Sequence, residues 1–233
     1  MQEVRLQKFL SGYGVASRRA IEEKIKQGKI VIDGKKALLG QKVTGQEKIL
    51  IDGLIFKPQH PVQKTKVLAF YKPKGVECTM VKLQKGKTLI DFPFREKGFF
   101  PIGRLDKNSQ GLFLLTNEGL LANRIMHPRY EHEKEYLVSV REKFSPGILK
   151  KFASGLVIDG YKTKPCVAEK VNTSVFRVVL KEGRNRQIRK LCEVCGLTVT
   201  DLLRVRIQNI WLGHMKPGKW RILSDTEVKG LVA

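Results

Sequence analysis

The stretch from Phe99 to Gly119, FFPIGRLDKNSQGLFLLTNEG, constrains the fold of this chain more than any other. Two apolar runs flank a polar segment that Gly103 and Gly111 bracket. This pattern predicts two buried strands joined by a loop, and the glycines allow that loop to turn sharply. The loop carries a charged pair, Arg104 and Asp106, and the turn can place the carboxylate at a sheet edge.

The charge of the chain limits the partners it can have. Its 233 residues include 45 Lys and Arg against 22 Asp and Glu, a formal net charge of +23. The excess is spread over the chain and does not form a tail, which favours a folded surface that binds nucleic acid. A basic protein that is indifferent to RNA is the alternative. Without a signal peptide or an apolar run of about 18 residues, we expect a cytoplasmic location.

The order of apolar patterns predicts an α+β protein of two domains. Residues 1–60 form a small first domain, residues 61–66 a proline-containing linker, and residues 67–233 a larger second domain. In the second domain, strand-like runs and shorter helical runs do not alternate strictly, which indicates a mixed, mostly antiparallel sheet flanked by helices. A Ser224 to Glu227 capping box is expected to open a last short helix.

Two helices and a small sheet are predicted in the first domain. Ser17 is a suitable N-cap for the second helix, and Gly28 is a suitable stop signal. The dipeptides Asp33-Gly34 and Asp52-Gly53 lie between β-branched residues and predict hairpin turns.

Most familiar catalytic motifs are absent from the sequence. It contains no phosphate-binding loop, no GxGxxG and no HExxH, and its single C-x-x-C, Cys192 with Cys195, lacks further zinc ligands. We expect these cysteines to pack in a core and the four histidines to lie at the surface. Any reaction therefore runs without a cofactor or metal, and a carboxylate with a cationic partner is the strongest candidate.

Asp106 is an aspartate that turn chemistry does not explain, while Asp91 and Asp201 lie in mixed stretches that the sequence does not assign. Asp33, Asp52 and Asp159 each precede a glycine in a predicted turn, whereas Asp106 lies between two apolar runs. A structural salt bridge is an alternative explanation for its position.

The helix pair with Ser17-Arg18-Arg19 resembles the S4-type RNA-binding domain, the alpha-L fold of ribosomal and RNA-modifying proteins. In that family the second helix presents a basic face to RNA. The resemblance implies an RNA-binding role for Arg18 and Arg19, and it also nominates Arg5, Lys8 and Lys24, although a solvated helix face would hold similar residues.

The second domain resembles the pseudouridine synthases, in particular the group with an S4-type domain that modifies ribosomal RNA. The matching motifs, in order, are YKPKG, GRLDKNSQGLFLLTNEG, HEKEYLVSV, EGRNRQIRKLCE and LLRVRIQNIWLG. Their details are most similar to the large-subunit synthase F type. The resemblance implies isomerisation of uridine in RNA, without a cofactor, after the nucleotide flips out of its stack.

The same resemblance implies roles for individual residues. Asp106 corresponds to the essential aspartate, Arg189 to its basic partner, Tyr136 to the aromatic that stacks on uracil, and Leu203 to an apolar residue of the pocket. Arg104 would face the flipped nucleotide rather than pair with Asp106. Further substrate or RNA contacts are implied for the neighbours of these motifs: Leu105, Lys107, Asn185, Arg186, Gln187 and Ile188.

The resemblance also implies partners. They are ribosomal RNA of the large subunit (23S rRNA) and a tRNA anticodon loop as a possible second substrate, bound by a monomer. A ribosome-assembly factor that has this fold and only binds RNA is the alternative function.

Overall fold

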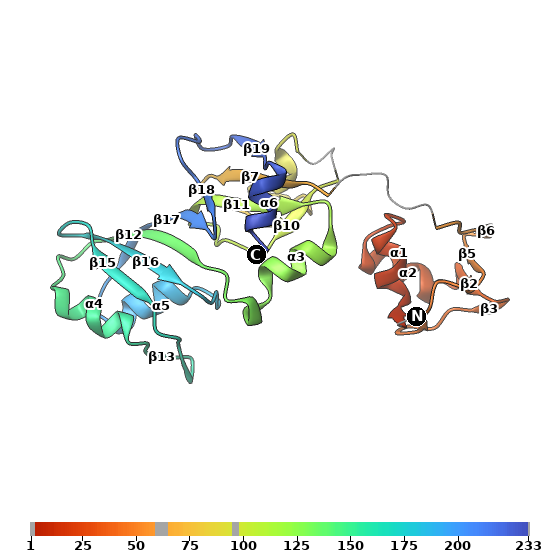
Figure 1. The fold of residues 1–233 in the computed structure, drawn as a ribbon, viewed down its shortest axis with the longest axis horizontal. Helices are drawn as coiled ribbons and strands as arrows, with labels where there is room; N and C mark the ends of the chain where they lie inside the picture. Colours follow the sequence, from red (N-terminus) through yellow and green to blue (C-terminus); the bar gives the residue numbers. More distant parts are fainter. Residues whose placement is uncertain (1–2, 59–64, 95–97, 233) are drawn as a thin grey trace. The chain divides into compact units, whose positions relative to one another are not determined.

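The structure is a computed structural model that describes residues 3–58, 65–94 and 98–232 (Figure 1). The chain divides into two compact units, Met1–Lys64 and Thr65–Ala233. Most of the predicted linker, residues 61–64, lies outside the described residues.

The N-terminal unit contains the predicted pair of helices, α1 (Leu6–Gly12) and α2 (Arg18–Lys26). The Ser17 side chain caps α2 by accepting a hydrogen bond of 3.2 Å from the Ala20 amide. Beyond the helix, Gly28 has φ +68°, a left-handed conformation that glycine adopts without a steric penalty. The prediction of a capped second helix is therefore confirmed.

A four-stranded sheet covers these helices, in the order β3-β2-β5-β6. Its strands are β2 (Ile30–Ile32), β3 (Lys35–Lys36), β5 (Ile49–Ile51) and β6 (Leu54–Ile55), and a second ladder joins β1 (Val4–Arg5) to β4 (Lys42–Val43). Both predicted Asp-Gly turns are present, because Asp33 and Asp52 have positive φ angles before glycines that also do. One core of buried aliphatic residues joins the sheet and the helices: Leu6, Leu10, Ile21, Ile25, Ile30, Ile32, Ala37, Val43 and Ile49.

The larger unit is built on a nine-stranded sheet within the described residues, in the order β15-β16-β12-β17-β11-β7-β19 with β10 and β18 added at its sides. Its strands are β7 (Val67–Lys72), β10 (Phe100–Ile102), β11 (Gln110–Thr116), β12 (Lys134–Val140), β15 (Val167–Lys170), β16 (Val175–Leu180), β17 (Val199–Ile207), β18 (Ile210–Trp211) and β19 (Trp220–Ile222). The pair β11 and β17 is parallel and the other ladders of this sheet are antiparallel. The predicted α+β class with a mixed sheet is confirmed.

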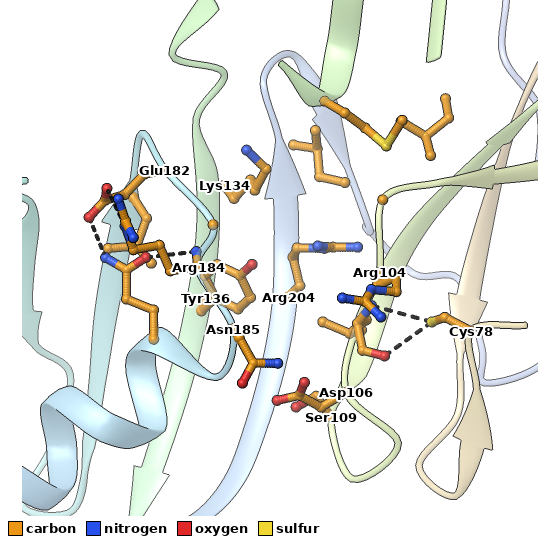
Figure 2. A pocket seen from close by; sticks show the side chains of 18 of the residues that line it. Cys78, Arg104, Asp106, Ser109, Lys134, Tyr136, Glu182, Arg184, Asn185 and Arg204 are labelled. Atoms are coloured by element: carbon orange, nitrogen blue, oxygen red, sulfur yellow. Dashed lines mark hydrogen bonds and ion pairs between the residues drawn. The ribbon is translucent and has the colours of Figure 1, made fainter. Parts of the chain in front are cut away.

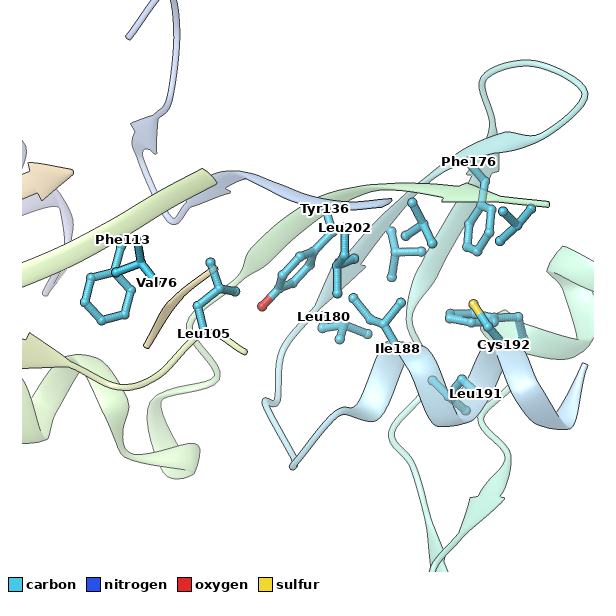
Figure 3. Close-up of a cluster of buried hydrophobic side chains, with 14 of the residues drawn as sticks. Val76, Leu105, Phe113, Tyr136, Phe176, Leu180, Ile188, Leu191, Cys192 and Leu202 are labelled. Atoms are coloured by element: carbon cyan, nitrogen blue, oxygen red, sulfur yellow. The ribbon is translucent and has the colours of Figure 1, made fainter. Parts of the chain in front are cut away.

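Helices cover both faces of this sheet. Apolar residues of α4 (Pro146–Ala153) and α5 (Gln187–Val194) belong to one core, which Figure 3 shows, and those of α3 (Gly119–Met126) and α6 (Asp225–Gly230) belong to or pack against the other. Along β11, Phe113 and Leu115 point into the first core, and Leu112 and Leu114 into the second. This alternation buries the central strands on both faces.

Short elements complete the larger unit. They are β8 (Val76–Glu77) paired with β9 (Lys87–Thr88), β13 (Val157–Ile158) paired with β14 (Tyr161–Lys162), and the 3-10 turns η1 (Leu89–Asp91) and η3 (Pro128–Tyr130). The predicted capping box of Ser224 and Glu227 opens α6. None of the described helices is long and apolar enough to cross a membrane.

The stretch from Phe99 to Gly119 forms the two predicted strands. Ile102 of β10 pairs with Leu114 of β11, and residues 103–109 form the loop between them. Gly111 has φ +108°, and a Cβ atom there would lie 2.3 Å from the Arg204 carbonyl oxygen. Glycine is therefore required for the parallel strands β11 and β17 to come together next to the loop of Asp106.

Candidate active site

A pocket of about 810 Å³ opens on the larger unit beside the loop of Asp106 (Figure 2). Four of the segments that line it are the loop 103–109, the start of β12, the turn from β16 to α5, and β17. They are distant in sequence, and the sheet brings them together because β12 and β11 both pair with β17.

The structure brings Arg189 next to Asp106, which lines this pocket. Arg189 Nε lies 3.9 Å from Asp106 Oδ2, and the side chains of Arg189 and Asp106 are 16% and 30% exposed. The same guanidinium donates hydrogen bonds from Nη2 to the Asn108 carbonyl at 3.1 Å and to Ser109 Oγ at 3.3 Å. Burial, followed by the charge of Arg186, lowers the pKa of Arg189, and the charge of Asp106 opposes this shift. Arg189 thus offsets the carboxylate and fixes the loop that carries it.

Arg104 behaves differently from Arg189. Its side chain is exposed at the pocket and makes no ion pair or hydrogen bond with any described residue. The expectation that Asp106 pairs with the distant Arg189 rather than with the adjacent Arg104 agrees with this geometry.

The backbone on both sides of Asp106 is held by groups that sequence reasoning did not assign to the site. Cys78 Sγ donates to the Leu105 carbonyl at 3.1 Å and accepts from the Leu105 amide at 3.3 Å. Lys72 Nζ donates to the carbonyl oxygens of Pro73, Val76 and Lys107. The first lysine of the motif YKPKG therefore holds the loop of Asp106 in place through hydrogen bonds to backbone carbonyl groups.

Lys72 loses its hydration in this position. Its side chain is fully buried, and burial lowers the pKa of Lys72 to about 8. A lysine at the end of the apolar run VLAFYK is the signal that could have identified it, because a lysine is rarely fully buried without a specific partner.

Tyr136 lines the pocket from β12 and is 8% exposed. Its ring belongs to the same apolar cluster as Leu105, Ile188 and Leu202, as Figure 3 shows. A rigid aromatic face at a pocket wall can stack on a flat base. Leu105 and Ile188 are core residues that also line the pocket, so their contribution to a ligand is apolar.

The prediction for Leu203 is wrong by one residue. Leu202 lines the pocket, whereas Leu203 packs against the core on the opposite face of the sheet. Successive side chains of a strand point to opposite faces, so an error of one residue exchanges the pocket for the core.

The prediction that Gln187 donates to RNA phosphates is also contradicted. Gln187 is 3% exposed, donates to Glu182 Oε1 at 2.6 Å and accepts from the Arg184 amide at 3.1 Å. Its amide group closes the turn before α5 and is not available to a ligand. Asn185 and Arg186 are exposed at the pocket, and Arg186 has φ +52° just before the helix begins.

Lys107 lies at the rim of the pocket. It is exposed and forms an ion pair of 3.0 Å with Glu77, so part of its charge is already offset.

Two further cations of the pocket were missed by sequence reasoning, Lys134 on β12 and Arg204 on β17. Lys134 Nζ donates to the His132 carbonyl at 3.0 Å, and Arg204 Nε donates to the Leu112 carbonyl at 2.7 Å. The signal for Lys134 was its spacing from Tyr136, since alternate residues of a strand share a face.

In the N-terminal unit, Arg18 and Arg19 are exposed in the first turn of α2 and form no ion pair with a described residue. Arg5 and Lys8 are also exposed. Lys24 differs, because it pairs with Asp52 and is thus less available to RNA than predicted.

The cysteines and histidines do not form a metal site within the described residues. Cys192 is fully buried in the core, and burial raises its pKa to about 12, in agreement with the predicted packing role. His60 lies outside the described residues. The surface position expected for His132 is wrong, since it is buried and bonded to the Arg124 carbonyl.

Comparison with known proteins gives consistent matches. Residues 66–194 match the family described as RNA pseudouridylate synthase, and residues 4–49 match the S4 domain. The chain is 39% identical over 225 residues to the dual-specificity RNA pseudouridine synthase RluF of Escherichia coli (strain K12), covering 97% of this chain and 77% of that protein. It is 38% identical over 238 residues to the ribosomal large subunit pseudouridine synthase B of Bacillus subtilis (strain 168), covering 98% and 96%.

A solved structure shares the fold. The crystal structure of a pseudouridylate synthase matches with a TM-score of 0.72 and 24% identity, covering 98% of this chain and 100% of that one.

Proposed function

Because the chain belongs to the RNA pseudouridylate synthase family, and is therefore an enzyme that converts uridine in RNA to pseudouridine, we propose that Asp106 is its catalytic carboxylate. The observation that carries this proposal is the ion pair of Asp106, a pocket residue, with Arg189. The other two carboxylates of the pocket are engaged elsewhere, Glu77 by Lys107 and Glu182 by Gln187.

One carboxylate suffices for this reaction. Glycoside hydrolases generally need a second one to activate water or to protonate a leaving oxygen. In pseudouridine formation the uracil stays in the pocket and rejoins the same ribose, so no water is consumed. Asp106 would act on the ribose, as a nucleophile at C1′ or as a base beside it, and Arg189 would hold it in place.

The remaining pocket residues would bind the flipped nucleotide. Tyr136 would stack on the uracil, with Leu105, Ile188 and Leu202 around the stacked ring. Arg104 would take the space or the charge beside the flipped nucleotide, since no protein group engages it among the described residues. Exposed hydrogen-bond donors at the mouth of the pocket, including Asn185 and Arg186, would bind RNA phosphates.

We further propose large-subunit ribosomal RNA (23S rRNA) as the substrate and a tRNA anticodon loop as a second one. Support comes from the names of the similar proteins, which describe a large-subunit ribosomal enzyme and a dual-specificity RNA enzyme. The S4 domain, through Arg18 and Arg19, would supply a second RNA contact. The enzyme would act as a monomer in the cytoplasm, where ribosomes are assembled.

The substitution Asp106→Asn tests the catalytic proposal. It keeps the size of the side chain and removes its charge, so pseudouridine formation should fall by at least ~10³-fold while RNA affinity stays within about threefold. Asp33→Asn is a matched control, because asparagine tolerates the left-handed turn that Asp33 occupies. Turnover by the Asp106→Asn enzyme near the wild-type rate would rule out this role.

An experiment in cells distinguishes an enzyme from a ribosome-assembly factor that only binds RNA. Deletion of the gene, followed by mapping of pseudouridine across rRNA and tRNA, should reveal the missing site. Restoration of that site by the wild-type gene but not by Asp106→Asn supports catalysis as the main function. If Asp106→Asn supports normal growth and ribosome assembly where the deletion does not, RNA binding is the main function.

A further inference from the structure

Two cations, the half-buried Lys134 and the buried Arg204, lie beside Tyr136 in the pocket. Arg204 is the direct cross-strand partner of Tyr136 in the ladder of β12 with β17. Lys134 precedes Tyr136 by two residues on the same strand, and both cations line the pocket. Directly paired residues of an antiparallel ladder have Cα atoms about 4.5–5.5 Å apart, so the three side chains form one group. Figure 2 shows Tyr136 with Lys134 on one side and Asn185 on the other.

Neither cation has a counter-ion in the described part of the chain. Each donates one hydrogen bond, to a carbonyl oxygen rather than to a carboxylate. The acidic residues of the same segment are paired elsewhere, since Glu133 and Glu135 both form ion pairs with Arg206. Arg204 is only 4% exposed, and its Nη2 is a buried nitrogen that has no partner.

Such an arrangement is unfavourable in the empty pocket. Burial of an unpaired charge costs free energy unless a ligand brings an opposite charge. Burial, with a smaller contribution from the charge of Arg204, lowers the pKa of Lys134 to about 8. A pocket that keeps two cations in this state is complementary to negative charge on whatever it binds.

The positions of Lys134 and Arg204 in the pocket indicate which negative charge of the RNA they bind. RNA phosphates are permanently charged and strongly solvated, and exposed arginines at the pocket mouth, Arg104, Arg184 and Arg186, suit them. Lys134 and Arg204 lie deeper, beside the ring of Tyr136. A uracil stacked on that ring would direct its carbonyl oxygens at these two groups. Those oxygens become negatively charged only during the reaction.

We propose that Lys134 and Arg204 form a cationic site that stabilises the uracil anion while the base is detached from the ribose. This inference rests on the proposed function, because it requires a uracil stacked on Tyr136. When the N1–C1′ bond breaks, its electron pair stays on uracil and spreads to O2 and O4. C5 then forms the new bond to C1′, the C5 proton leaves, and N1 gains a proton, so the overall change is an isomerisation. Groups that bind developing charge in a buried site stabilise the transition state more than the substrate.

The test compares rate and affinity in two variants, Lys134→Met and Arg204→Met. Each should lower the single-turnover rate of pseudouridine formation by about 10²–10³-fold, the usual effect of removing one donor to a developing anion, and change the Kd for RNA by less than about threefold. Lys216→Met, which removes an exposed charge of the same unit, is the matched control and should have the wild-type rate.

A second substrate excludes a merely structural role. In RNA that carries 5-fluorouridine at the target position, the fluorine withdraws electrons, so the detached base holds negative charge more easily. Loss of intact 5-fluorouridine should therefore be slowed less by Lys134→Met than conversion of uridine is. Lys134→Arg should keep much of the rate, because it keeps the charge.

Three results would overturn the inference. A raised Kd with a smaller salt dependence and an unchanged rate would show that the two cations bind a phosphate. Equal losses on both bases, with a lowered Tm, would show a structural role. Wild-type rate and affinity in both variants would show that the cations have no role. Failure of the proposed function is distinct, because it would appear as an active Asp106→Asn enzyme.

Discussion

The two units of this protein keep their positive charge in opposite places. In the N-terminal unit, Arg18 and Arg19 are exposed on α2, and the buried core beneath the helices holds none of the cations of that unit. In the larger unit, Lys134 and Arg204 line a pocket and Arg189 pairs with Asp106 beside it. Arg204 is buried, and Lys134 and Arg189 are half-buried. Exposed charges act through their number and are screened by salt, whereas buried charges act through their position. The same residue types are thus suited to affinity in one unit and to chemistry in the other.

The largest effect is expected from Arg189. Arg189→Met removes the partner of Asp106 and the bonds to Asn108 and Ser109, so the loop loses its position. We expect the single-turnover rate to fall by about 10²–10³-fold with a small change in the Kd for RNA. Lys190→Met is the neighbouring control, because Lys190 pairs with the exposed Asp159. A wild-type rate for Arg189→Met would show that this charge of the larger unit does not serve the reaction.

A pH profile sharpens the contrast further. Burial lowers the pKa of Lys134 to about 8, so its charge is complete only well below pH 8 and is lost as the pH rises through that value. The single-turnover rate should then fall above about pH 8, approaching tenfold per pH unit. Burial lowers the pKa of Lys72 to about 8 as well, so a variant of Lys134 is needed to tell which of the two lysines causes the fall in rate. Lys134→Arg should move the fall to higher pH, and an unchanged profile would assign it to another group.

A smaller effect is expected from the exposed charges. Arg18→Gln with Arg19→Gln should weaken RNA binding and reduce the slope of log K against log salt concentration by about 2, with the rate at saturating RNA unchanged. Lys24→Gln is the control, and its effect should be weaker because Lys24 is already paired with Asp52. A lower saturated rate in the double variant would show that the N-terminal unit takes part in the reaction.

The smallest effect concerns the stability of α2. Ser17→Ala removes the hydrogen bond to the Ala20 amide and should destabilise the helix by about 1 kcal/mol, measured by hydrogen exchange of the α2 amides. Ser145→Ala is a matched control at the N-cap of α4, where the side chain makes no capping hydrogen bond. Equal effects of both changes on their helices would show that the cap at Ser17 contributes nothing.

Local signals in the sequence predicted much of the fold. The turns at Asp33 and Asp52 and the caps at Ser17 and Ser224 depend on neighbours within a few residues, so their physics is visible in the sequence. The resemblance to a family added Asp106 and Arg189, which lie far apart along the chain. It could not fix side-chain direction, and the register error at Leu203 and the buried amide of Gln187 follow from that.

The sequence by itself determined the class of the protein, predicted its two-part organisation and singled out the carboxylate that we propose as catalytic, because motifs, turn residues and apolar periodicity are properties of the chain itself. Only the tertiary structure decided which cations face which charges. Arg104 is two residues from Asp106 and has no described partner, whereas the distant Arg189 forms the ion pair with Asp106. Lys134 and Arg204 both lie beside Tyr136. The reason is that burial and pairing depend on which strands become neighbours, and the order of the strands in the sheet differs from their order in the sequence.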